Sequence, residues 1–315
     1  MKLLAAFLKL IRFSNLVFIA ATQVWYYYGI MVPIGDSVPG AQMRTTPDIF
    51  WLVVAASVLI AAGGYIINDY FDLNIDRVNR PNQLVVEKVI KRRWAIVWHI
   101  FLSFMGLACS FYAGFRLGNP FVGLLNTVVV ILLWFYSTTF KKQLLIGNVI
   151  ISLLTAWVVL VLYVCESRMD LHLLDAPELD LLSSIMKTAV LYGGFAFVIS
   201  LIREIVKDME DREGDARYQC RTMPIVWGLS ASKGFVFSWM IVLAACVLIL
   251  AVYSIQIHWW WLALYLVITV LIPLGLAFPA LAKAQVQSDF SQLSRRIKWI
   301  MLAGTLSMIF FKLYL

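Results

Sequence analysis

Charged side chains are scarce in this sequence. Asp, Glu, Lys and Arg make up 14% of its 315 residues, while 62% are hydrophobic. That charged share is about half of what soluble domains carry. The apolar residues come in blocks of roughly twenty, the length that crosses a bilayer as an α-helix. The low charge and the long apolar blocks exclude an ordinary soluble domain and predict an integral membrane protein.

Cysteine and histidine are also too sparse to build a metal centre. The four cysteines lie far apart and form no CxxC pair, and the three histidines are equally scattered. This spacing favours unpaired, structural cysteines over a disulfide framework or a zinc site. A long polar linker and low-complexity segments are absent too, so the sequence predicts a single membrane domain over residues 1–315.

The apolar blocks predict nine transmembrane helices. The first block follows Lys2, Lys9 and Arg12; it is too long for a signal peptide and no small-residue cleavage site follows it, so we expect a retained helix. The predicted spans are about 13–34, 48–68, 91–115, 120–138, 145–165, 183–206, 235–255, 259–281 and 297–314.

The basic residues predict the orientation of these spans. With an inside N-terminus, the N-terminal segment and the loops after the second, fourth, sixth and eighth spans hold 21 of the 26 Lys and Arg. Basic residues concentrate on the cytoplasmic side of membrane proteins, so we expect the N-terminus and these loops in the cytoplasm. The same asymmetry explains the net charge of +8 without a nucleic-acid partner.

Acidic residues gather at two of these loops. In "YIINDYFDLNIDRVNRP", Asn68, Asp72 and Asp76 stand at i, i+4 and i+8, on one helix face. Asp69 falls off that face, and we expect no special role for it. The motif ends the second span.

A second acidic stretch, "REIVKDMEDREGD", ends the sixth span, four helices later and on the same side. Asp208, Asp211 and Asp215 stand at i, i+3 and i+7, with Glu204 one turn before Asp208. They share a face if the helix continues to Gly214. Glu210 and Glu213 fall outside this face, so we expect no special role for them.

Carboxylates clustered at membrane depth are costly and repel one another. A divalent cation removes this problem, and Mg²⁺ commonly binds one or two carboxylates together with substrate phosphates. The two acidic motifs therefore predict two or more Mg²⁺ ions bridged by one diphosphate. Nearby basic residues would complement its remaining oxygens: Arg77, Arg80, Lys141, Lys142 and Lys207.

These motifs resemble those of the UbiA superfamily of intramembrane prenyltransferases. Its NxxxDxxxD pattern is met by Asn68, Asp72 and Asp76, and its second acidic motif by "KDMEDREGD", followed by "CRTMPI". "YSTTFKK" resembles the family's Tyr-Ser…Lys segment, and Asn15 in "RFSN" matches a recurrent asparagine. The sequence is most similar to the branch that acts on geranylgeranylglyceryl phosphate. It lacks the "RTxxRPL" segment of other branches and has "NQLVVEKVI" where "IPSG" often follows "NRP".

The resemblance implies an all-α membrane protein, with nine helices around a central cavity, arranged as two four-helix pseudo-repeats and a last helix. It implies Mg²⁺-dependent transfer of a prenyl group, such as geranylgeranyl, from an isoprenoid diphosphate to a lipophilic acceptor in a bacterial or archaeal cell membrane. Geranylgeranylglyceryl phosphate or a similar lipid is one acceptor class, and an aromatic quinone or pigment precursor is the other. A cation-coupled transporter is the alternative of another class, although transporters usually place their acids near the bilayer midplane.

The site residues follow from the motifs and the resemblance together. The residues expected to be catalytic are Asp72, Asp76, Asp208 and Asp211. The expected metal ligands are Asn68, Asp72, Asp76, Asp208, Asp211 and Asp215. The expected substrate-binding residues are Asn15, Asn68, Arg77, Arg80, Tyr136, Lys141, Arg203 and Lys207. Consecutive residues point about 100° apart on a helix, so only one of Lys141 and Lys142 can aim at the diphosphate, and the resemblance favours Lys141.

Overall fold

The computed structural model describes residues 2–79, 85–168 and 175–315, and within these ranges the chain is helical and forms no β-sheet. The described residues contain nine stretches that are long and apolar enough to cross a membrane. The nine spans are α2, η1 and α3 (Phe13–Tyr26, Tyr27–Met31 and Val32–Ser37), α4 (Pro47–Asn79), α5 (Arg92–Leu117), α6 (Phe121–Thr138), α7 (Ile146–Glu166), α8 (Ala176–Glu210), α11 (Gly228–Gln256), α12, η4 and α13 (Trp260–Leu266, Val267–Leu271 and Ile272–Lys283), and α14, η5 and α15 (Gln287–Leu306, Ser307–Ile309 and Phe310–Tyr314).

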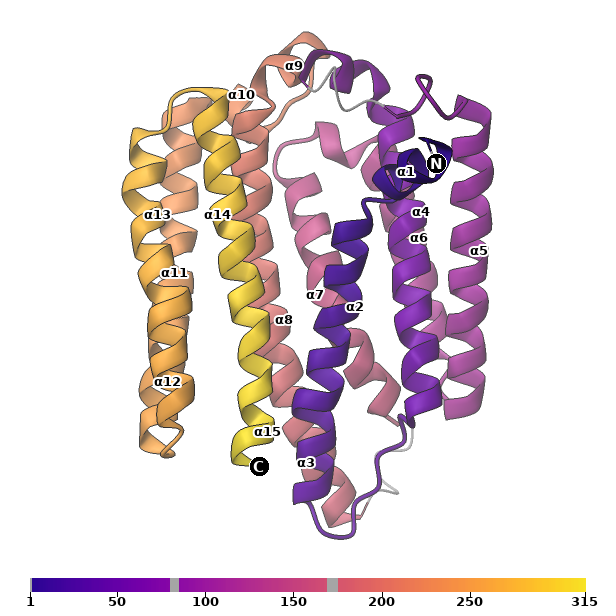
Figure 1. Ribbon diagram of the computed structural model, residues 1–315, viewed down its shortest axis with the longest axis vertical. Coiled ribbons are helices and arrows are strands. Elements are labelled where there is room, and N and C mark those ends of the chain that lie inside the picture. Colours follow the sequence, from indigo (N-terminus) through magenta and orange to yellow (C-terminus); the bar gives the residue numbers. More distant parts are fainter. Residues whose placement is uncertain (1, 80–84, 169–174) are drawn as a thin grey trace.

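Four short helices join or precede these spans. They are α1 (Lys2–Leu10), η2 (Phe140–Lys142), α9 (Arg212–Arg217) and α10 (Met223–Val226). Figure 1 shows α1, α9 and α10 at one end of the bundle, and α3 and the C-terminus at the other. The end with α1, α9 and α10 is called the motif end below, because α4 and α8 finish there.

The nine predicted spans are confirmed, but several helices are longer than the apolar blocks. Helix α4 has 33 residues and α8 has 35, whereas about 20 suffice to cross the bilayer. The extra turns are polar, which hydropathy does not count as membrane. At the start of α8 the Asp175 side chain accepts a hydrogen bond from the Glu178 backbone N–H, 3.0 Å away, so the helix begins seven residues before the predicted span. The extra turns at the motif end carry the acidic residues.

Two of the spans pack against one side of the bundle. In Figure 1, α11 and the stretch from α12 to α13 lie at one edge of the bundle, beyond α14. Their buried residues join one apolar core with α8 and α14, which includes Val236, Met240, Leu274 and Leu281. A second core joins α2, η1, α4, α7 and α8. The bundle is thus a ring of helices with an added helix pair on one side.

Helices α4 and α5 approach each other closely through small residues. A Cβ built on Gly63 would lie 2.7 Å from Ser103 Oγ, and one built on Gly106 would lie 2.7 Å from Ile60 Cγ1. Without a hydrophobic force between helices in lipid, such close packing is a main source of association. This contact fixes α4, and with it the first acidic motif. The two motif helices are the second and sixth spans, as expected, while the four-helix pseudo-repeat remains a prediction.

Candidate active site

A cavity of about 520 Å³ opens among the helices at the motif end. Its lining residues come from α1, α2, α4, α6, α7, α8, α9 and α14, with a few from the connecting segments, and none comes from α5 or from the described residues of α11 to α13. Polar and charged residues lie toward the motif end. Deeper along the same helices the wall is mostly apolar, with Ile60, Ala61, Val129, Leu133, Leu154 and Val158. Such a cavity suits a molecule with a charged head and an apolar tail.

The first acidic motif lies on a continuous helix that reaches Asn79. Asn68, Asp72 and Asp76 all line the cavity, as their spacing on one face requires. Asn68 and Asp72 are buried. Asp69, which falls off that face in the sequence, also lines the cavity, so its lack of a special role remains a prediction.

Cations of the chain neutralise this motif. Arg12 Nη2 donates to Asp69 Oδ1 at 2.8 Å and to Asn68 Oδ1 at 3.3 Å. Lys141 Nζ donates to Asp72 Oδ2. Burial lowers the pKa of Lys141, but the charges of Asp72, Tyr136 and Asp76 and the hydrogen bond to Asp72 together raise it, so the pKa of Lys141 lies above its ordinary value. Lys141 is therefore charged at any physiological pH.

The second acidic motif is not one continuous helix, which corrects the expectation that α8 persists to Gly214. Helix α8 ends at Glu210, and α9 begins at Arg212 after a turn at Asp211. Asn79 explains the turn: its Nδ2 donates to Asp211 O at 3.2 Å, and Gly214 N donates to Asn79 Oδ1 at 2.9 Å. A Cβ on Gly214 would lie 2.2 Å from that oxygen, so glycine is needed for this approach.

The break still brings the second motif to the cavity. Asp208, Asp211 and Asp215 line it, whereas Glu213 is exposed and does not. Asn148 Nδ2 donates to Asp208 Oδ2 at 2.8 Å, so an uncharged amide orients this carboxylate. Burial raises the pKa of Asp215 to about 6, and the Asp211 and Asp72 carboxylates add to the rise while Lys141 opposes it. The two motifs therefore share an excess of negative charge.

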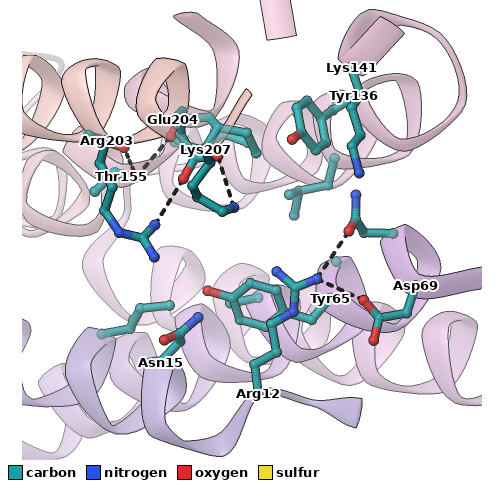
Figure 2. A pocket seen from close by; sticks show the side chains of 18 of the residues that line it. Arg12, Asn15, Tyr65, Asp69, Tyr136, Lys141, Thr155, Arg203, Glu204 and Lys207 are labelled. Carbon is teal, nitrogen blue, oxygen red and sulfur yellow. Dashed lines mark hydrogen bonds and ion pairs between the residues drawn. The ribbon is translucent and has the colours of Figure 1, made fainter. Parts of the chain in front are cut away.

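Glu204 joins two further cations at the cavity wall, which Figure 2 shows from close by. Arg203 Nη1 lies 3.0 Å from Glu204 Oε1, and Lys207 Nζ lies 3.4 Å from Glu204 Oε2. The charged ends of Arg203 and Lys207 point into the cavity, toward the wall that holds Asn15 and Tyr65. Cations and carboxylates thus alternate along α8.

The donor set fits Mg²⁺ under one condition. Carboxylate and amide oxygens are the ligands this ion prefers, and the negative excess around Asp215 favours a cation. Among the residues that the structure describes, however, no three His, Cys, Asp or Glu side chains lie close enough to hold a metal by themselves. Ions here would need phosphate oxygens as additional ligands, which is the common arrangement for Mg²⁺.

Most of the expected substrate-binding residues line the cavity. These are Asn15, Asn68, Tyr136, Lys141, Arg203 and Lys207. Arg77 corrects the prediction: its Nη2 pairs with Glu87 Oε2 at 2.5 Å, and the residue lies outside the cavity. It follows Asp76 directly, so it points about 100° away from the motif face. Arg80 lies outside the described residues. Lys142 is exposed and does not line the cavity.

Three cavity cations were missed because the positive charge was attributed to membrane topology. Lys9 lies in the last turn of α1, Arg12 precedes α2, and Lys298 lies in the ninth span; all three line the cavity. On α14, Lys298, Met301 and Thr305 stand at i, i+3 and i+7 and share the cavity face. A lysine on an otherwise apolar face is a readable signal for an intramembrane site. Asn148, the partner of Asp208, carried no comparable signal.

Long helices around a cavity, with carboxylates and cations at one end and an apolar wall beyond, define a multi-pass membrane protein with an internal site for an amphiphilic anion. The chain belongs to the UbiA prenyltransferase family, whose model matches residues 16–302. The resemblance inferred from the two acidic motifs is thereby confirmed.

Two curated relatives carry the same name, digeranylgeranylglyceryl phosphate synthase. The protein of Methanothermobacter thermautotrophicus is 32% identical over 196 residues, which are 62% of this chain and 62% of that protein. The protein of Methanosphaera stadtmanae is 28% identical over 253 residues, which are 79% of this chain and 83% of that protein. The first match thus spans somewhat less than two thirds of its relative.

Solved structures share the fold. One, described as a digeranylgeranylglyceryl phosphate synthase in membranes, has a TM-score of 0.65 and 25% identity, and the match covers 98% of this chain and 99% of that one. Another is a UbiA homolog from Archaeoglobus fulgidus bound to DMAPP and Mg²⁺, with a TM-score of 0.58 and 16% identity, covering 96% and 98%. The expected nine-helix architecture is confirmed by these likenesses.

Proposed function

We propose that this protein is a Mg²⁺-dependent prenyltransferase that transfers a geranylgeranyl group from geranylgeranyl diphosphate to geranylgeranylglyceryl phosphate. The observation that carries the proposal is that both acidic motifs and several cations line one cavity, which continues along an apolar wall. A prenyl diphosphate has the same two parts, a charged head and an apolar tail. The names of the curated relatives support the choice of acceptor.

The reaction breaks the bond between the allylic carbon and the diphosphate oxygen, and the electron pair leaves with the diphosphate. The acceptor's hydroxyl oxygen then forms an ether bond to that carbon, and its proton is released to the diphosphate or to water. Bound Mg²⁺ would offset the negative charge that grows on the departing diphosphate. Asn68, Asp72, Asp76, Asp208, Asp211 and Asp215 are the residues that would hold it.

Residues of the protein would bind the diphosphate, exclude water and stabilise the cation-like carbon. Lys141, next to Asp72, would donate to diphosphate oxygens that the metal leaves uncovered. The apolar wall would hold the prenyl chain and exclude water from the cation-like carbon. Tyr65 and Tyr136 also line the cavity, and their rings offer a face that stabilises positive charge.

We further propose that residues 1–315 form one domain and that the motif end faces the cytoplasm. Residues of both halves of the chain line one cavity, which supports a single domain. Basic residues concentrate at the motif end, and this bias favours the cytoplasmic side.

Incubation of membranes that contain the protein with labelled geranylgeranyl diphosphate and separate acceptors tests the proposal. Label is expected in a product with geranylgeranylglyceryl phosphate and not with an aromatic acid such as 4-hydroxybenzoate. Product with the aromatic acid alone would overturn the acceptor, and ion transport without any product would overturn the enzyme class.

A further inference from the structure

Three cations form a group on one side of the cavity, and one of them, Lys207, directly precedes Asp208 on α8. Arg203 and Lys207 come from α8, and Lys298 comes from α14. We call these three residues the cationic patch. Lys298 lies near enough to Arg203 and Lys207 for their charges to act on it. Two helices far apart in sequence therefore build the patch.

Lys298 adds a positive charge to the patch that its hydrogen-bond partner does not cancel. Glu204 is the carboxylate that bonds to Arg203 and Lys207. Lys298 Nζ instead donates to the neutral amide oxygen of Asn15, 2.8 Å away. This amide fixes the lysine end at the cavity wall without cancelling its charge.

Arg203 shows an unused hydrogen-bonding group as well. Its Nε is buried and has no hydrogen-bond partner in the structure. A buried donor without a partner is unfavourable. The Arg203 guanidinium and the Lys207 ammonium both point into the cavity (Figure 2). An oxygen-rich anion at this place would satisfy the donor and balance the charge.

Such an anion would not be one that Mg²⁺ carries. Metal ions are attracted to the aspartates and repelled by the cationic patch. A diphosphate held by metal therefore belongs at the aspartates, and the patch suits a second phosphate held by side chains alone. Arginine and lysine donors bind a phosphate monoester in this way.

We propose that the cationic patch binds the phosphate of the acceptor lipid, with Lys298 as the residue that makes the enzyme prefer a phosphorylated acceptor. The inference rests on the proposed function, because it assumes two phosphorylated substrates in one cavity. It divides the site into a metal-bearing half for the donor and a metal-free half for the acceptor. The apolar wall below serves both lipid tails.

Binding of two probe lipids tests this division. Purified protein in lipid nanodiscs, with EDTA present, is titrated with geranylgeranylglyceryl phosphate and with geranylgeranylglycerol, which lacks the phosphate. The wild type is expected to bind the phosphorylated lipid at least about tenfold more tightly, as for other charge-assisted contacts. Lys298→Met should remove most of that preference, and Lys298→Arg should restore it.

Two controls separate a binding role from a structural one. Arg296→Met, on the exposed side of the same helix and outside the cavity, should keep the wild-type preference. With Mg²⁺ present, Lys298→Met should bind geranylgeranyl diphosphate within about twofold of the wild type, because no contact to the donor is lost. If Lys298→Met does not fold, Lys298→Gln, which removes the charge and keeps a polar side chain, is measured in the same way.

Equal binding of the two probe lipids by the wild type would overturn the proposal. So would a Lys298→Met variant that loses the diphosphate donor and keeps the phosphorylated acceptor. The titration requires no turnover, so a protein that forms no prenylated product but binds as expected would contradict the proposed function alone.

Discussion

The two acidic motifs differ in how the chain neutralises their carboxylates. On α4, Asp69 and Asp72 pair with Arg12 and Lys141, both supplied by other segments. On α8, the partner that orients Asp208 is the uncharged amide of Asn148. Asp69 and Asp72 of the first motif are thus paired with cations of the protein, whereas Asp208 of the second motif accepts a hydrogen bond from a neutral amide.

This difference suggests unequal tasks for the two motifs. A metal held by Asp72 would compete with Lys141, whose ammonium would then be available to donate to diphosphate oxygens. A metal that binds Asp208 would compete with the hydrogen bond from Asn148 and with the nearby charge of Lys207. We therefore expect the second motif to bind the ion readily and the first motif to couple metal binding to the delivery of Lys141.

Removal of divalent cations should have the largest effect on prenyl transfer, because it would take the metal ions from both acidic motifs at once. Excess EDTA is expected to reduce prenyl transfer to background, because the carboxylates can hold the diphosphate only through a cation. Added Mg²⁺ should restore the activity, measured as labelled product per minute. Full turnover in excess EDTA would contradict a metal role for either motif.

Substitution of one aspartate in each motif comes next. Asp72→Ala and Asp208→Ala should each lower kcat/KM by about 100-fold or more, since each removes a group that stabilises charge in the transition state. Glu213→Ala is the control: it lies between Asp211 and Asp215 but is exposed, so its effect should stay within about twofold. Equal losses from Glu213→Ala and Asp208→Ala would contradict the assignment of the cavity face.

A comparison of adjacent lysines tests the partner of the first motif. Lys141→Ala removes the cation beside Asp72 and should weaken use of the prenyl diphosphate about ten- to a hundredfold, the range for charge-assisted hydrogen bonds. Lys142→Ala should change little, because that side chain is exposed. Steady-state kinetics at saturating acceptor and varied donor measure both. Small, equal effects would indicate that both lysines only set the orientation of the protein in the membrane and do not bind the donor.

The smallest effect is expected from Arg77→Ala, next to the first motif but turned away from it. The pair with Glu87 is exposed, and such pairs contribute roughly 0–1 kcal/mol to stability. Donor and acceptor KM values should match the wild type, and thermal unfolding should shift slightly. A large increase in the donor KM would indicate that Arg77 binds the donor and would contradict its placement outside the site.

The spans and motif faces could be predicted because each rests on a local pattern. Runs of about twenty apolar residues set the nine helices, and four-residue spacing placed Asn68, Asp72 and Asp76 along one cavity wall. Helix lengths could not be obtained in this way, since polar turns extend α4 and α8 beyond the lipid. The spacing did not place Asp69 at the cavity, where it pairs with Arg12 of the turn between α1 and α2.

Contacts between distant segments explain the remaining differences. The turn at Asp211 depends on Asn79, which is 132 residues away along the chain. No local sequence pattern predicts this turn. Lys298 was counted as a basic residue of a cytoplasmic loop, and its hydrogen-bond partner Asn15 lies on α2, 283 residues away along the chain. Such pairings arise only when the bundle closes, so they were outside the reach of periodicity and hydropathy.

Helices α11 to α13 pack beside the ring and contribute no described residue to the cavity. Substitutions on their outward faces can therefore occur without changing the residues that line the cavity. Exchanges among apolar residues there can adjust the fit to a thicker or thinner bilayer, where mismatch costs fractions of a kcal/mol per Å. Relatives of this protein can thus move into membranes of different lipid composition and retain the same set of reactive side chains.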